Sequence, residues 1–249
     1  MIAWHPLWLL RTVQFLGVAS LILCWGQADI LLVVLFTFLI AICGQGIGQH
    51  RYFSHKSFKT DDIKHKLLAI LATLSTSGSI LHWSAVHRYH HENADTDKDI
   101  HNPKILGYFK TFFMLYNPVN IPKSFTVKLR DLLKDPVVMF THNYYWFIIL
   151  SYIIFLAILG PTYLVSCYLI PVGFARLSGG IQSAFTHGLM GYRNFDIKDK
   201  STNHTLCNYI TFGEGLHNNH HKYPGKYSFV SHPAEIDPTG WVIEKLWRK

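Results

Sequence analysis

The sequence ILLVVLFTFLIAICGQGIGQHRYFSH, residues 30–55, joins an almost uninterrupted apolar run to two histidines, His50 and His55. A run of this kind, close to the ~20 residues needed to cross the hydrocarbon core of a bilayer, predicts a membrane-spanning helix. The two histidines are too far apart to share one face of an ideal helix, so we expect the helix end and the following turn to supply one imidazole each. The segment therefore predicts a spanning helix that ends in a polar site.

The rest of the chain is also unusually apolar. Hydrophobic residues make up 49% of the 249 residues, and the mean hydropathy is +0.16. This composition is typical of a membrane protein. We expect an all-α integral membrane fold in one domain, 1–249, with transmembrane helices in two hairpins, an interfacial helix and a cytoplasmic helical cap. The four expected spans cover about 7–25, 30–48, 137–160 and 163–182, and the cap covers about 49–136 and 183–249.

Positive charge is distributed unevenly along the chain. Of the 23 lysines and arginines, only Arg11 and Arg176 lie outside 51–134 and 182–249, and the short turns 26–28 and 160–162 carry none. Basic segments remain preferentially on the cytoplasmic side of a membrane. We therefore expect a multi-pass protein with both termini and the active site in the cytoplasm, and basic residues that contact lipid headgroups rather than nucleic acid.

Two histidine triplets, HRYHH at 87–91 and HNNHH at 217–221, carry the strongest chemical signal. Residues at i, i+3 and i+4 share one face of a helix, so each triplet is expected to direct three imidazoles toward a single point. With His50, His55 and a later histidine, His187, the set exceeds the four positions of a tetrahedral zinc site. The pattern predicts a site for two metal ions.

The apolar stretch 65–83 decides on which side of the membrane these motifs lie. If it crossed the bilayer, the histidines before it and after it would lie on opposite sides and could not share a site. Its second half is also polar, STSGS at 75–79. We therefore expect one helix over 65–83 that lies at the membrane interface. The proline-containing segment 117–136 is expected to be a connector.

The segments HRYFSH, HRYHHENADTDKDIHNP, SAFTHGLMGYRNFD and GEGLHNNHHKYP resemble, in this order, the signatures of the membrane fatty acid desaturases, closest to the stearoyl-CoA (Δ9) desaturase branch. The resemblance covers about 49–241. It implies an enzyme that uses two Fe²⁺ ions and O2 to place a cis double bond, expected at Δ9, in a saturated acyl chain. The iron ligands that it implies are His50, His55, His87, His90, His91, His187, His217, His220 and His221.

Further site residues follow from the same motifs. The family usually has asparagine four residues before the lone histidine, where it holds a water near one iron, and this chain has Ser183. Carboxylates commonly orient metal-binding imidazoles, a role that we expect for Glu92 and Glu214 and consider for Asp95, whereas Asp97 and Asp99 are expected in solvated turns. The expected walls of an acyl tunnel are Thr73, Ser77, Leu81 and Trp83. A polar headgroup is expected near Arg51, Arg88, Asn93, Asn102 and Arg193.

The expected partners are an acyl-CoA or acyl-lipid substrate, membrane lipid and a separate electron donor, ferredoxin or cytochrome b5, because no His-Pro-Gly-Gly haem motif occurs in the chain. Two alternatives use similar residues. A membrane di-iron hydroxylase or alkane monooxygenase would share the histidine cluster and the oxidant. A membrane metal carrier is disfavoured, because transporters place their polar residues near the middle of the bilayer and not beyond the helix ends.

Overall fold

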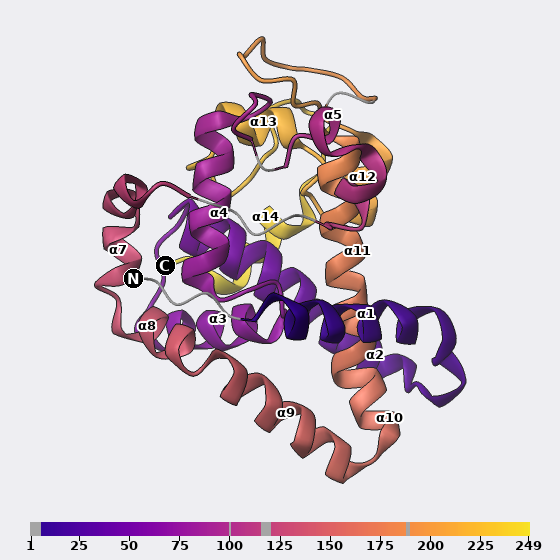
Figure 1. Ribbon diagram of the computed structural model, residues 1–249. Coiled ribbons are helices and arrows are strands. Elements are labelled where there is room, and N and C mark those ends of the chain that lie inside the picture. The colour runs from indigo at the N-terminus through magenta and orange to yellow at the C-terminus, as the bar shows by residue number, and fades with distance from the viewer. Residues whose placement is uncertain (1–5, 100, 116–120, 188–189) are drawn as a thin grey trace. The chain divides into compact units, whose positions relative to one another are not determined.

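The computed structural model describes residues 6–99, 101–115, 121–187 and 190–249, which form helices and no named strand (Figure 1). Isolated antiparallel bridges join Asn203 to Tyr192 and to Leu216. The all-helical prediction is therefore confirmed over these ranges. In chain order the helical elements are α1 (Leu7–Leu23), η1 (Trp25–Gln27), α2 (Ile30–Thr37), η2 (Phe38–Ser54), α3 (Asp62–Leu74), α4 (Ile80–Asn93), α5 (Pro103–Leu106), α6 (Tyr108–Phe112), η3 (Lys123–Leu129), α7 (Arg130–Leu133), α8 (Pro136–Asn143), α9 (Tyr145–Leu159), α10 (Pro161–Leu164), η4 (Val165–Leu169), α11 (Ile170–Phe185), α12 (Thr205–Ile210), α13 (His217–Lys222), α14 (Pro238–Val242) and η5 (Ile243–Trp247).

Two continuous helical stretches are long and apolar enough to cross a membrane, Ile30–Ser54 and Pro161–Phe185, each of 25 residues. Helices α8 and α9 meet at an angle of 66° and count as a third span only if the bent pair is one span. Helix α1 is apolar but has only 17 residues. Helices thus lie in all four predicted regions, and the four-span topology stays a prediction.

The helices group into two compact units, between which the chain passes several times. The first unit comprises the described residues of Met1–Gln49, Asp62–Ser84 and Ser124–Arg176, and the second those of His50–Asp61, Ala85–Lys123 and Leu177–Lys249. The prediction of one domain over 1–249 is not tested by this grouping. The expected connector 117–136 contains η3 and α7, and its residues 117–120 lie outside the described residues.

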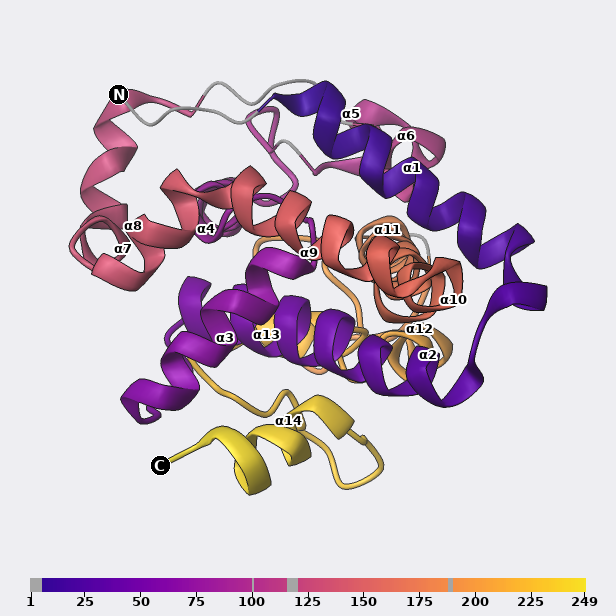
Figure 2. The ribbon, with the colours of Figure 1, turned by 90° about the horizontal axis from the view of Figure 1, so that it is seen from below.

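The first unit has an apolar core shared by helices that are distant in sequence. Leu10 and Val13 of α1, Tyr145 and Ile149 of α9, and Tyr168 of η4 are buried in one cluster. In the view of Figure 2, α9 runs between the labels of α1 and α2, all three in the first unit. Aspartate caps fix where two helices of this unit begin, since Asp29 accepts hydrogen bonds from the first turn of α2 and Asp135 from that of α8.

A buried break separates α3 from α4, so the prediction of one helix over 65–83 is wrong. Side chains of the first unit hydrogen-bond the backbone groups that lack a helical partner at this break. Gln14 Nε2 donates to the Thr76 carbonyl at 2.7 Å, Gln49 Nε2 donates to the Gly78 carbonyl at 2.7 Å, and the Gly78 N–H donates to the Tyr145 hydroxyl at 3.1 Å. A buried break in a helix is stable only where its backbone polar groups have such partners.

Two glycines bring helix backbones into direct contact in the first unit. A Cβ atom on Gly17 of α1 would meet the backbone nitrogen of Gly173 in α11 at 2.8 Å, and a Cβ atom on Gly173 would meet the Gly17 backbone. Small residues allow close helix approach in membranes, where packing replaces the hydrophobic effect as the driving force. Glycine is therefore required at both positions by space.

Candidate metal centre

Nine histidines of the second unit gather into two clusters. In each cluster, one ring nitrogen per residue lies within 4.8 Å of the others. The five-histidine cluster contains His50, His55, His87, His91 and His220. The four-histidine cluster contains His90, His187, His217 and His221. These are the nine residues that the sequence selected.

Each histidine triplet is on a helix, as predicted, but it does not point to one place. On α4, His87 and His91 belong to the five-histidine cluster and His90 to the four-histidine cluster. On α13 the division is reversed, because His217 and His221 join the four-histidine cluster. The expectation of a single point is wrong, because successive helical residues are rotated by about 100° at 3.6 residues per turn. Each helix therefore serves both clusters.

The other three histidines come from helix ends. His50 lies in η2 and His55 in the turn after it, which confirms the predicted division between helix and turn. His187 follows the end of α11, and its Nε2 lies 2.9 Å from His217 Nε2. Helix ends thus bring residues that are distant in sequence beside the two triplets.

Carboxylates contact the outward-facing nitrogens of four rings. His90 Nδ1 lies 2.8 Å from Asp99 Oδ1, His187 Nδ1 lies 3.3 Å from Asp95 Oδ2, and His221 Nδ1 lies 3.3 Å from Asp199 Oδ2. In the five-histidine cluster, His50 Nδ1 contacts Glu214 Oε2. A carboxylate beside Nδ1 holds a proton there and fixes both the tautomer and the orientation of the ring.

This tautomer leaves the Nε2 lone pair of His50, His187 and His221 directed at the Nε2 atom of a neighbouring ring. His50 Nε2 lies 3.0 Å from His220 Nε2, and His221 Nε2 lies 3.0 Å from His217 Nε2. A neutral imidazole has one N–H, so a ring that donates from Nδ1 has only an acceptor at Nε2. His217 Nε2 faces two such acceptors, the Nε2 atoms of His187 and His221, and it can donate a proton to only one of them, whereas a cation would satisfy all three. The donor set therefore fits two metal ions, and neutral imidazole is a suitable ligand for iron.

Burial favours the neutral form of several of these rings, and nearby positive charges and hydrogen bonds favour the ionised form of the carboxylates. Burial, followed by neighbouring imidazoles, lowers the pKa of His217 and His220 well below the usual 6.5. Burial alone would raise the pKa of Glu214, but Arg51 and His50 lower it to about 2. Burial alone would raise the pKa of Asp99 too, but the hydrogen bond and charge of His90 together with backbone N–H donors lower it. Neutral imidazoles and ionised carboxylates are the forms that metal binding requires.

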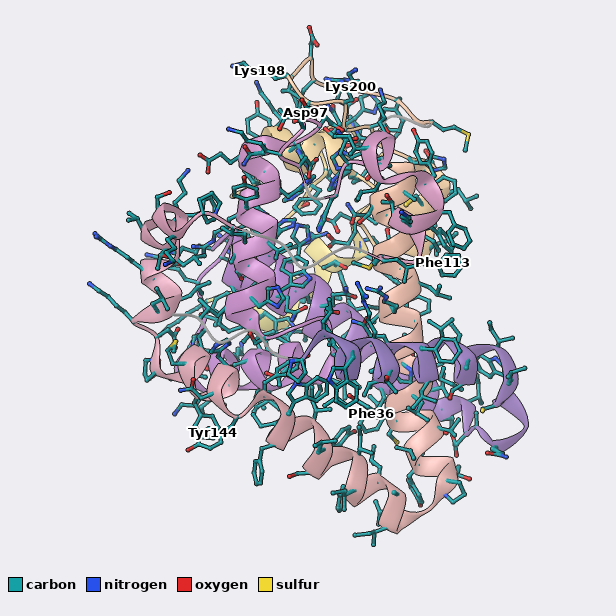
Figure 3. All side chains as sticks on the ribbon, viewed as in Figure 1. Phe36, Asp97, Phe113, Tyr144, Lys198 and Lys200 are labelled. Carbon is teal, nitrogen blue, oxygen red and sulfur yellow. The ribbon has the colours of Figure 1, made fainter. Side chains whose placement is uncertain are left out.

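Of the acidic residues near the clusters, one contradicts its prediction and one was not predicted. Asp99 is only 4% exposed, so the prediction of a solvated turn is wrong for it. Asp97 is exposed, as predicted, and Figure 3 shows it near Lys198 and Lys200 at the outer edge of the second unit. Glu92 is also exposed, and its expected role beside a ring stays a prediction. Sequence reasoning missed Asp199, because it lies in a polar loop with nothing to link it to His221.

The fourth residue before His187 is buried, as a water-holding role for it would require. Ser183 is 7% exposed on α11. Its neighbour Gln182, which sequence reasoning missed, has its Nε2 atom 2.9 Å from His217 Nδ1. Ser183 lies in the last turn of α11, and His187 follows the end of that helix. The water-holding role of Ser183 stays a prediction.

The residues expected near a headgroup make contacts within the second unit. Arg88 donates to the carbonyls of Phe53 and Ser54, which ties α4 to the end of η2. Arg193 donates to backbone carbonyls of the loop 195–199. Asn93 donates to a carbonyl of α4 and Asn102 caps α5. Arg51 is completely buried, an environment unlike an exposed headgroup contact.

The residues expected in the acyl tunnel belong to the first unit. Thr73 and Leu81 are buried, and Ser77 and Trp83 are half-buried. The Thr73 hydroxyl donates to the Ala69 carbonyl one turn earlier in α3. Their role as tunnel walls stays a prediction.

Removing the carboxylate charge at Asp99 is expected to weaken metal binding at the four-histidine cluster. The D99N amide cannot stabilise a proton on His90 Nδ1 as a carboxylate does, and changing such a partner costs about 10–100-fold in metal affinity. The measurement is a Co²⁺ titration of the metal-free protein. D97N is the matched control, because Asp97 is exposed and lies two residues before Asp99 in the same loop. Equal affinities in D99N and the unmodified protein would contradict the prediction.

Comparison with known proteins agrees with this geometry. The family model described as fatty acid desaturase matches residues 28–233. Stearoyl-CoA desaturase 5 of Bos taurus is 28% identical, over 98% of this chain and 76% of its own length. The sn-1 stearoyl-lipid 9-desaturase of Anabaena variabilis is 31% identical, over 82% of this chain and 72% of its own. The hex-5-enoyl-[acyl-carrier protein] acetylenase of Moorena producens is 32% identical, over 83% of this chain and 71% of its own. The chain therefore belongs to the fatty acid desaturase family, in its Δ9-desaturase-like branch, and is an oxidoreductase of lipid metabolism.

Proposed function

We propose that the protein is an O2-dependent fatty acyl desaturase that introduces a cis double bond, at Δ9, into a saturated acyl chain. The observation that carries the proposal is the pair of adjacent histidine clusters, in each of which one ring nitrogen per residue lies within 4.8 Å of the others. Two iron ions, when bound, would supply with O2 the oxidant that an unactivated C–H bond requires. Their ligands would be the five histidines of one cluster and the four of the other.

The protein's own groups have three tasks in this reaction. Glu214, Asp95, Asp99 and Asp199 orient the ligand rings through their Nδ1 atoms. The buried surroundings of the rings exclude bulk water from the oxidant. Adjacent methylenes are chemically alike, so the position of the double bond must come from how far the acyl chain enters, a role assigned to Thr73, Ser77, Leu81 and Trp83.

The substrate carrier and the electron donor are further parts of the proposal. The three relatives are named for CoA, lipid and acyl-carrier-protein substrates. We assign an acyl-CoA or acyl-lipid to this chain, with electrons from a separate ferredoxin or cytochrome b5. The basic segments 51–134 and 182–249 support a multi-pass membrane protein whose termini and metal centre face the cytoplasm.

The test is the fatty acid profile of a desaturase-deficient host that expresses this chain, with double-bond positions determined by mass spectrometry. A new cis-monoene at carbon 9 is expected. A monoene at another carbon would retain desaturation and reject the Δ9 assignment. Hydroxylated acids or alcohols would instead identify a membrane hydroxylase or alkane monooxygenase, because the substrate radical would then recombine with hydroxyl. An unchanged profile in the presence of both electron donors would contradict the proposal.

A further inference from the structure

A completely buried arginine follows His50. Arg51 is 0% exposed, and its guanidinium is held by two carboxylates of the second unit. Its Nε and Nη2 donate to Glu214 Oε1 at 3.0 and 2.8 Å. Its Nη1 donates to Asp237 Oδ2 at 2.7 Å, and its Nη2 donates to Asp237 Oδ1 at 3.1 Å. Buried charges are tolerated when they are paired and hydrogen-bonded in this way.

Arg51 reaches one ligand of the five-histidine cluster through Glu214. The guanidinium occupies Oε1 of this carboxylate, and the other oxygen, Oε2, contacts His50 Nδ1. The two oxygens are rigidly connected, so the position of Arg51 fixes the direction from which Oε2 approaches the ring. Glu214 therefore acts as a bridge between Arg51 and His50.

Arg51 reaches a second ligand through an aromatic ring. The guanidinium carbon lies 3.7 Å from the centroid of the Phe229 ring, and the same ring lies 4.5 Å from the His220 ring. His220 Nδ1 is buried and, among the residues that the structure describes, has no hydrogen-bond partner. No carboxylate therefore orients this imidazole through Nδ1, and packing against Phe229 takes that place.

Asp237 fixes the position of Phe229 relative to Arg51. Its Oδ2 accepts the backbone N–H of Phe229 at 2.8 Å as well as Arg51 Nη1, and its Oδ1 accepts the Gly240 N–H at 2.9 Å. Arg51 Nη1 also donates to the Tyr227 carbonyl at 2.7 Å. The segment 227–240 is thus attached to the metal centre by both polar and ring contacts.

We propose that Arg51 and Asp237 form a positioning pair for the five-histidine cluster. The pair orients His50 through Glu214 and His220 through Phe229, and it makes segment 227–240 part of the metal centre. The matched region of the family model ends at residue 233, before Asp237. The inference rests on the proposed metal centre, but metal affinity can be measured whether or not a double bond is formed.

The experiment is a Co²⁺ titration of the metal-free full chain in detergent, with D237N and F229L as test variants. H217A and H220A, one ligand from each cluster, identify which binding step belongs to which cluster. Both test variants are expected to weaken binding at the five-histidine cluster by about 10–100-fold, the usual effect of losing the support of a ligand, and to leave the four-histidine cluster unchanged. The visible spectrum of the Co²⁺ bound at the five-histidine cluster is expected to shift.

The matched control is E244Q. Glu244 lies in η5, just after segment 227–240, and pairs with Arg248 at 2.7 Å, but both side chains are exposed. We expect both binding steps to stay unchanged in E244Q. F229L keeps the ion pairs and most of the apolar volume. If D237N does not fold, the metal affinity of F229L therefore still tests the proposal.

The proposal is overturned if folded D237N or F229L binds both ions with unchanged affinity. It is also overturned if both steps weaken equally, since a general structural role would not select one cluster. Failure of the proposed function would look different, because the unmodified protein would bind two ions and still form no double bond.

Discussion

Replacing His217 by alanine is expected to abolish double-bond formation and to remove one of the two bound metal ions. His217 Nε2 lies 2.9 Å from His187 Nε2 and 3.0 Å from His221 Nε2, so it is central to the four-histidine cluster. Changing a partner of a ligand already costs about 10–100-fold in metal affinity, and loss of the ligand itself should cost more than about 100-fold. H220A should do the same to the five-histidine cluster.

Two measurements check this prediction, the metal content of the purified protein and the fatty acid profile of the expressing host. The matched control is H232A, because His232 is exposed and belongs to neither cluster. H232A should retain two ions and full activity. The ligand assignment would be wrong if H217A retained two ions and formed the product at the normal rate, with equal amounts of protein in the membrane.

Local geometry explains why the sequence predicted the identity of the clustered histidines. Spacing alone places His87, His90 and His91 on one helix, and the separation of His50 from His55 requires a helix end. Helical rotation, which is equally local, already implies that His90 and His91 diverge by about 100°. Their division between two clusters was nevertheless not predicted, because it depends on which long-range partners lie on each side.

Contacts between distant segments could not be predicted from the sequence. Asp199 meets His221 because a loop folds back toward α13, and Asp99 is buried because it binds His90. The break before α4 is stable because Gln14 and Gln49 satisfy its carbonyls, and neither residue is near it in sequence. Each of these outcomes depends on tertiary partners that satisfy a polar group, which local patterns do not encode.

The contact between Gly17 and Gly173 predicts the second large effect, a loss of stability in G173V. Any Cβ atom at position 173 would overlap the backbone of Gly17, and backbone atoms cannot move aside as a flexible side chain can. Overpacking a well-packed contact typically costs about 1–3 kcal/mol, and we expect the upper end of about 3 kcal/mol because two helix backbones must separate. The measurement is thermal unfolding in detergent, followed by circular dichroism.

Gly26 provides the matched control for this substitution. A Cβ atom there would meet nothing within 4 Å, so G26A should unfold within about 0.5 kcal/mol of the unmodified protein, the range of ordinary surface changes. G17A should destabilise the protein as G173A does, since both fill the same space. The double variant G17A/G173A should lose less free energy of unfolding than the two single variants together. Helices that one methyl group has already separated leave room for the other. The matched comparison is G173A with G26A, and equal melting temperatures for these two variants would show that the two backbones are not in contact.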